Sequence, residues 1–252
     1  MWGESFLILE GRDLDVYIGG SHILQGISFE IRPEVTTAVL GRNGAGKTTL
    51  ARAVMGLMGK FPANSLMFRP ASTGTLDKVL DLSVHEPEYR VSCGIAYVPQ
   101  GRRLFPSLTV EENIYVGGYA AAKTGRNHYW SIDDIYEVFP RLYERRYVSA
   151  SVLSGGEQQM LAIARAINAS PCCLIFDEPT EGLSPKMIET VLEIIKRVMS
   201  RGVTVFLFEQ NVDFISELAS DIILLQSGQV FGVDRDLERD DMQRIGREFI
   251  AL

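Results

Sequence analysis

The sequence has few of the residues that build disulfide frameworks and structural metal sites. It contains three cysteines and three histidines in 252 residues. An odd number of cysteines without regular spacing argues against a disulfide framework and fits a reducing compartment. The histidines are scattered and match no ligand spacing, so a structural metal site is not expected. Cys172 and Cys173 lie beside an apolar run, which favours buried small side chains over ligands.

Long apolar runs are also missing. No stretch approaches the roughly 18 uninterrupted apolar residues of a membrane-spanning helix. The first residues, Met-Trp-Gly-Glu-Ser-Phe, lack a basic segment followed by an apolar core, so no signal peptide is expected. Any role at a membrane must therefore come through a partner protein.

Positive charge is in deficit. The chain has 25 Lys and Arg against 32 Asp and Glu, a net charge of −7. Nucleic-acid binding depends on a basic face that neutralises phosphates, so this balance argues against it. Short basic spots at residues 102–103 and 141–146 are interpreted as solvated surface.

Alternating strand and helix patterns predict the fold class. Short β-branched runs separated by helical patterns indicate an α/β fold with a largely parallel sheet. The length predicts one domain with a subdomain. We expect a core at about 1–108 and 169–236, a helical subdomain at about 109–168 and a C-terminal helix at about 237–252. Residues 61–92, with several prolines, allow no prediction.

Individual elements follow from the same patterns. The predicted strands are residues 7–17, 27–31, 36–40, 94–98, 173–176, 203–208 and 222–225. The predicted helices are residues 47–57, 110–117, 132–139, 157–168, 185–200 and 211–219, with a charged surface helix at 237–250.

A phosphate-binding loop follows the third strand. Its sequence fits G-x-x-x-x-G-K-[ST] between a strand and a helix, and an ordinary glycine-rich turn is the alternative. Backbone N–H groups and the helix N-terminus favour an anion there. Lys47 is expected to reach the β- and γ-phosphates, Thr48 to bind Mg²⁺ and Thr49 to contact the α-phosphate. The loop consists of Gly41, Arg42, Asn43, Gly44, Ala45, Gly46, Lys47, Thr48 and Thr49.

An apolar strand ends in two adjacent carboxylates, Asp177 and Glu178. The carboxyl ends of parallel strands line the ligand crevice. Asp177 is expected to hold Mg²⁺ through water, and Glu178 to activate the attacking water as a base. Strands often end in acidic residues, so the prediction depends on the phosphate loop in the same chain.

A second glycine-rich turn opens a later helix. Residues 153–159 read Leu-Ser-Gly-Gly-Glu-Gln-Gln. Ser154 is a good N-cap, and the glycines after it expose N–H groups at the positive end of the helix dipole. A capped helix with a flexible start is the alternative. A second anion site in one chain is explained if it completes the site of a neighbouring subunit.

Together these motifs resemble those of the ATP-binding subunits of ABC transporters. Residues 41–49 resemble Walker A, 174–178 resemble Walker B, and 153–158 resemble the signature LSGGQ, here written LSGGE. The resemblance covers nearly the whole chain. It implies a P-loop NTPase core, an N-terminal antiparallel β part, an inserted helical subdomain, and ATP with Mg²⁺ as cofactors. It also implies that Ser154, Gly155, Gly156 and Glu157 contact nucleotide.

The same resemblance assigns further residues. Gln100 matches the Q-loop glutamine that senses Mg²⁺ and couples to the membrane subunit, and Tyr17 matches the aromatic residue that stacks on adenine. Residues 182–185 occupy the D-loop position. Gln210 stands where the family usually has a histidine. Glutamine can contact the γ-phosphate but cannot carry a positive charge.

Residues 101–113, 177–183 and 209–211 are similar to the second ATPase subunit of branched-chain amino-acid importers and of their urea-importer relatives. This implies transmembrane permease subunits, a second ATPase subunit and, indirectly, a solute-binding protein as partners, and a place on the cytoplasmic face of the membrane. Residues 61–92 depart from the short hairpin that is usual in this subgroup, so the resemblance does not determine which solute is transported.

Two other functions remain as alternatives. The first is a non-transport ABC ATPase that acts on nucleic acid, although the long insertions and zinc sites of such proteins are missing here. The second is a nucleotide-binding regulator without turnover. Lys47, Asp177 and Glu178 argue against the regulator, while Gln210 keeps it open.

Overall fold

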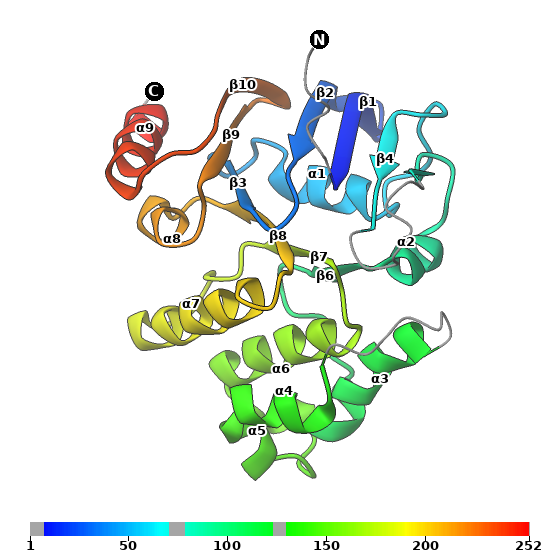
Figure 1. Ribbon diagram of the computed structural model, residues 1–252, viewed down its shortest axis with the longest axis vertical. Coiled ribbons are helices and arrows are strands. Elements are labelled where there is room, and N and C mark those ends of the chain that lie inside the picture. Colours follow the sequence, from blue (N-terminus) through cyan, green and yellow to red (C-terminus); the bar gives the residue numbers. More distant parts are fainter. Residues whose placement is uncertain (1–7, 71–78, 123–129, 252) are drawn as a thin grey trace.

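The computed structural model describes residues 8–70, 79–122 and 130–251 (Figure 1). Its centre is a six-stranded sheet. The strand order is β10 (Gln229–Asp234), β9 (Asp221–Gln226), β3 (Thr36–Leu40), β8 (Thr204–Glu209), β7 (Cys173–Asp177) and β6 (Ile95–Val98). All neighbouring strands are parallel except β9 and β10. The carboxyl ends of β3, β6, β7 and β8 therefore share one edge.

A smaller antiparallel sheet packs over one face of the parallel sheet. Its order is β2 (Ser21–Ile31), β1 (Leu9–Ile18), β4 (Leu66–Phe68) and β5 (Leu80–Asp81). Helix α1 (Lys47–Val54) packs in the same layer, against β7 and β8. Apolar side chains fill the space between the sheets, and the Phe29 and Phe206 rings lie 5.4 Å apart. This core holds the N-terminal end of α1 close to the sheet edge.

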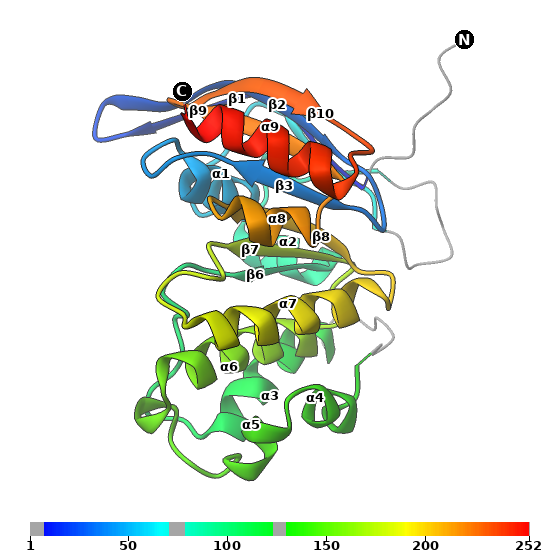
Figure 2. The same cartoon turned by 90° about the vertical axis from the view of Figure 1, so that its left-hand side faces the viewer.

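Helices cover the opposite face (Figure 2). Helices α6 (Gly155–Asn168), α7 (Pro185–Met199) and α8 (Val212–Ser216) pack on the sheet, and α3 (Val110–Ala122), α4 (Ile132–Val138) and α5 (Pro140–Glu144) gather around α6. Close approach of α3 to α6 requires glycine, because a Cβ on Gly117 would lie 1.8 Å from the Arg165 carbonyl oxygen. Asn168 Nδ2 donates to the Ile114 carbonyl at 2.8 Å.

The predicted α/β class and parallel sheet are confirmed, as is the burial of Cys172 and Cys173. Residues 61–92 contain β4, β5 and helix α2 (Pro87–Cys93), with residues 71–78 outside the described part. The N-terminal residues on which the signal-peptide prediction rests are also outside it. Within the described ranges, no helix combines the length and hydropathy of a membrane span.

The predicted C-terminal helix is α9 (Arg239–Ala251), and it packs on its own chain. Met242 is fully buried, and Gly246 lies so close to α8 that an added Cβ would stand 2.8 Å from Val212. Arg42 in the phosphate loop donates from Nε to the Ile250 carbonyl at 3.1 Å. The last turn of the helix is thereby joined to the loop.

Candidate active site

The phosphate loop runs from the end of β3 to the start of α1. Gly46 is the N-cap of α1, with φ at +107°, and no side chain caps the helix. Gly41 sits against the chain, where a Cβ would approach the Leu225 carbonyl oxygen to 2.6 Å. Both positions therefore favour glycine. The uncapped N–H groups of α1 are free to bind an anion.

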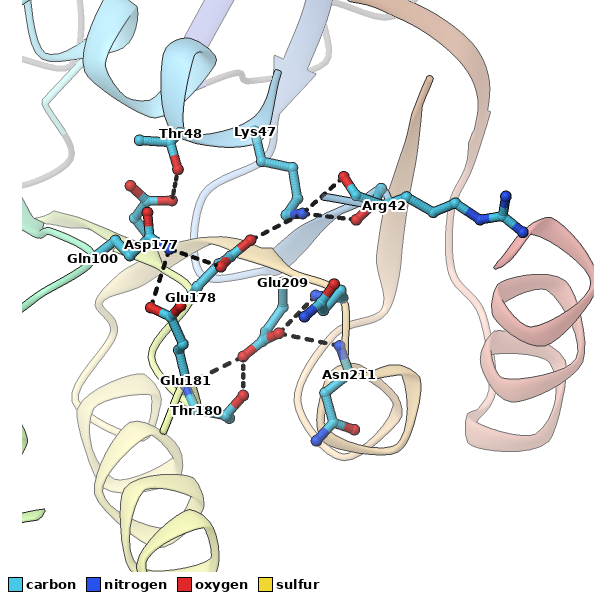
Figure 3. Close-up of polar contacts among 12 residues, drawn as sticks. Arg42, Lys47, Thr48, Gln100, Asp177, Glu178, Thr180, Glu181, Glu209 and Asn211 are labelled. Atoms are coloured by element: carbon cyan, nitrogen blue, oxygen red, sulfur yellow. Dashed lines mark hydrogen bonds and ion pairs between the residues drawn. The ribbon is translucent and has the colours of Figure 1, made fainter. Parts of the chain in front are cut away.

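Lys47 directs its ammonium group to the mouth of this loop (Figure 3). The side chain is 3% exposed, and Nζ donates to the carbonyls of Gly41 at 2.7 Å and Arg42 at 3.2 Å. Nζ also pairs with Glu178 Oε1 at 2.9 Å. A phosphate that reaches Lys47 must compete with this carboxylate.

Asp177 lies at the end of β7, beneath Thr48. Thr48 Oγ1 donates to Asp177 Oδ1 at 3.0 Å, and the Tyr97 hydroxyl donates to Oδ2 at 2.8 Å. Burial raises the pKa of Asp177, and the neighbouring Glu178 acts in the same direction, while the two hydrogen bonds oppose the change. A bound cation would favour the charged form of this carboxylate. Tyr97 was not predicted as a site residue, since its role depends on the pairing of β6 with β7.

Glu178 is held by groups from three segments. Besides Lys47, Gln100 Nε2 donates to Glu178 Oε2 at 3.1 Å and to Glu181 Oε2 at 3.0 Å. The Glu178 backbone N–H donates to the Phe208 carbonyl at 2.8 Å. Its φ is +49°, a conformation that residues other than glycine rarely adopt. Such backbone strain is common where a side chain must be aimed at a reacting group.

A buried carboxylate next to the predicted γ-phosphate contact was missed in the sequence. Glu209, at the end of β8, is 1% exposed. It accepts hydrogen bonds from the backbone N–H groups of Gln210 at 2.6 Å, Asn211 at 3.1 Å and Thr180 at 3.2 Å, and from the Thr180 hydroxyl. Figure 3 shows these bonds beside Glu178 and Lys47. Gln210 itself is exposed.

The second glycine-rich turn has the predicted cap. Ser154 accepts from the N–H of Glu157, and Glu157 Oε2 accepts from the N–H of Ser154 at 2.9 Å and its hydroxyl at 2.7 Å. Arg145 pairs with Glu157 at 3.0 Å. Partial burial alone would raise the pKa of Glu157, but the bonds from Ser154 and Arg145 outweigh it and the pKa is lowered. The carboxylate of Glu157 thus holds the turn in shape.

A cleft of about 350 Å³ extends from the phosphate loop toward the turn between β1 and β2. The signature residues 154–157 and Tyr17 are not among the described residues that line it. Tyr17 is 62% exposed and stacks on His22 with the ring centroids 4.2 Å apart. Arg42, Asn43 and Ala45 line a second pocket, with Phe249 of α9. The lining of the first cleft is Ile18, Ser21, Ile23, Gly44, Gly46, Lys47, Thr48, Thr49 and Glu178.

Comparison with known proteins gives the family. Residues 24–181 match the family model described as ABC transporter. The chain belongs to the ABC transporter family. A high-affinity branched-chain amino acid transport ATP-binding protein of Pseudomonas aeruginosa, BraG, is 37% identical over 86% of this chain and 88% of its own. A probable branched-chain amino acid transport ATP-binding protein of Archaeoglobus fulgidus, LivF, is 36% identical over 83% of this chain and 84% of its own.

Other relatives in the ABC family carry other solutes in their names. At 28 to 30% identity they are named for ribose in Geobacillus kaustophilus, arginine in Bacillus subtilis and glutamine in Escherichia coli. A nucleotide-free ATP-binding cassette from an ABC transporter matches the fold with a TM-score of 0.76, at 20% identity over 97% of both chains. A dimeric cassette with ADP and phosphate bound has a TM-score of 0.71, at 20% identity over 91% of this chain and 99% of that one. As an ABC ATPase, the chain binds and hydrolyses ATP.

Proposed function

We propose that ATP is hydrolysed where the phosphate loop meets the carboxyl ends of β7 and β8. The observation that carries this proposal is the convergence of Lys47 and Glu178 at 2.9 Å, with Gln100 bound to the same carboxylate. The β- and γ-phosphates lie over the N-terminus of α1 and bind Lys47, which releases Glu178. Glu178 then takes a proton from a water molecule. The oxygen of that water bonds to the γ-phosphorus while the bond between the γ-phosphorus and the ADP oxygen breaks. Gln210 contacts the γ-phosphate.

The oxygen ligands that Mg²⁺ prefers are present beside this site. Thr48 Oγ1 and Asp177 Oδ1 are 3.0 Å apart, which brings a hydroxyl and a carboxylate to one point, and Gln100, in the segment after β6, adds an amide oxygen. These three residues would hold the ion. When bound, Mg²⁺ neutralises charge on the phosphates.

The signature turn belongs, in this proposal, to the site of a second ATPase subunit. Ser154 and Gly155 are exposed and lie outside the cleft of their own chain. Their position is fixed by the capping bonds of Glu157, so the N–H groups of the turn are available to a γ-phosphate on a facing subunit. The existence of a solved dimeric cassette of this fold supports such an arrangement.

The transport function follows from the relatives. We propose that the chain energises an importer of branched-chain or other hydrophobic amino acids, or of urea, as a peripheral subunit on the inner face of the cell membrane. The two relatives at 36 to 37% identity, both named for branched-chain amino acids, support this solute class. Transmembrane permease subunits and a solute-binding protein complete the transporter.

Reconstitution of the chain with the permease and solute-binding proteins encoded beside it tests both parts. We expect ATPase activity in vesicles to rise with leucine-loaded binding protein, and a rise only with ribose would contradict the solute class. Glu178→Gln should keep ATP binding and lower the turnover by about a hundredfold or more. Glu193→Gln, an exposed change on α7, is the matched control. Turnover of Glu178→Gln at the normal rate would exclude Glu178 as the base.

A further inference from the structure

The turn between β1 and β2 presents different residues on its two faces. The register pairs Tyr17 with His22 and Ile18 with Ser21. Successive residues of a strand point to opposite faces. Ile18, Ser21 and Ile23 line the cleft that contains Lys47, whereas Tyr17 and His22 stack on each other and are absent from its described lining. The aliphatic face of the turn is therefore the one that looks onto the phosphate loop.

Tyr17 is held in its position by a small polar network. The Tyr17 and His22 rings are nearly parallel, with an interplanar angle of 10°. His22 Nε2 lies 2.6 Å from Asp15 Oδ1, and the same oxygen accepts the Gly26 N–H at 3.0 Å. One face of the Tyr17 ring is thus covered by a histidine that is itself anchored. The resemblance assigned Tyr17 to adenine, but this geometry does not favour that role.

We infer that the nucleobase rests on Ile18, and that the site discriminates weakly between purines. This inference rests on the proposed placement of the phosphates at Lys47, from which the cleft leads to Ile18. Ile18 is 45% exposed, so its side chain offers apolar surface to a ligand. Burial of apolar surface does not depend on the hydrogen-bonding edge of the base. Binding affinity then comes mostly from the phosphates.

The lining of the cleft supports weak discrimination. The turn between β1 and β2 forms one end of the cleft, which is lined there by Ile18, Ser21 and Ile23. Among these three side chains, the Ser21 hydroxyl is the one group that can form a hydrogen bond. Strong selection between ligands needs a site that leaves buried polar groups unpaired with the wrong one. An aromatic platform, by contrast, strengthens base binding by about fivefold or more.

Binding of three ligands to the full chain tests the inference. The ligands are Mg·ATP, Mg·GTP and magnesium tripolyphosphate. Calorimetry measures the affinity of each ligand for the unaltered protein, Tyr17→Ala, Ile18→Ala and Ile18→Tyr. We expect ATP and GTP to bind the unaltered protein within about threefold of each other. Ile18→Ala should weaken ATP by about threefold, and Ile18→Tyr should tighten it by about fivefold or more. Tyr17→Ala should leave it within about twofold.

Tripolyphosphate separates this inference from the proposed phosphate site. Its affinity should be the same in all four proteins, which also shows that each variant is folded, and it should be lost in Lys47→Ala. A loss of ATP affinity of about fivefold in Tyr17→Ala at constant tripolyphosphate affinity would overturn the role of Ile18. So would a preference of about tenfold or more for ATP over GTP in the unaltered protein. An affinity for tripolyphosphate that is unchanged in Lys47→Ala would instead refute the proposed function.

Discussion

At the scale of single residues, Glu209 joins the segment that follows Glu178 to the segment that contains Gln210. Its carboxylate binds the backbone of Gln210 and Asn211 on one side and Thr180 on the other. Thr180 follows Glu178 by two residues, so the proposed base and the predicted γ-phosphate contact share one anchor. A carboxylate only accepts hydrogen bonds, which suits a point where several donors converge.

Glu209→Gln tests this positioning role. The amide places N–H groups where an acceptor is needed, so at least one of the converging donors loses its partner. We expect kcat to fall by about tenfold with the KM for ATP changed less than about twofold, and stability to fall by about 2 kcal/mol. Steady-state kinetics and urea unfolding measure the two effects. Equal losses in kcat and in ATP binding would indicate a general structural defect instead.

At the scale of elements, the two ends of α1 differ in their hydrogen bonding. Its N-terminus faces the cleft without a side-chain cap, while Arg90 from α2 donates to carbonyls in its last turn. Arg90 is fully buried, and Nη1 donates to the carbonyls of Ala53 at 3.0 Å and Val54 at 2.6 Å. Burial lowers the pKa of Arg90 to about 10, against the raising effect of Glu86 and Asp81, so the guanidinium stays charged at neutral pH. A cation here complements the negative end of the helix dipole.

Arg90→Leu should therefore destabilise the protein through α1. The carbonyls of Ala53 and Val54 lose a charged donor inside the core, and we expect a loss of about 3 kcal/mol in the free energy of unfolding. Urea denaturation with an unchanged m-value measures it. Arg52→Leu, an exposed change in the last turn of the same helix, should stay within about 0.5 kcal/mol. Similar losses of unfolding free energy in both variants would contradict a specific role of Arg90 at the end of α1.

How much of this site was predictable depends on the range of the contacts. The phosphate loop and the paired Asp177 and Glu178 are local patterns, and β3, α1 and β7 begin where those patterns predict. Contacts of Tyr97 with Asp177 and of Glu209 with Thr180 join segments 80 and 29 residues apart. No local spacing encodes them, because they arise from the order of strands in the sheet. The short strands β4 and β5 could not be predicted from the sequence either, since two or three residues carry no periodic signal.

At the scale of the whole molecule, the two surfaces proposed to bind phosphate do not meet within one chain. One is the cleft at Lys47, at the start of α1, and the other is the capped turn at Ser154, at the start of α6. Figure 1 shows α1 and α6 on opposite sides of the parallel sheet. If one subunit supplies the first surface and a facing copy supplies the second, each assembled dimer contains two shared sites. A symmetric dimer places the same pair of patches together twice.

A mixture of two inactive variants distinguishes shared sites from complete ones. Lys47→Ala removes the phosphate contact and Ser154→Arg blocks the turn, so each variant alone should hydrolyse little ATP. A mixed dimer has one site with both defects and one site with neither. Random mixing in equal amounts should restore about a quarter of the normal ATPase rate for a homodimer. If each chain held a complete site, the mixture would stay inactive, and thermal melting of each variant verifies that both are folded.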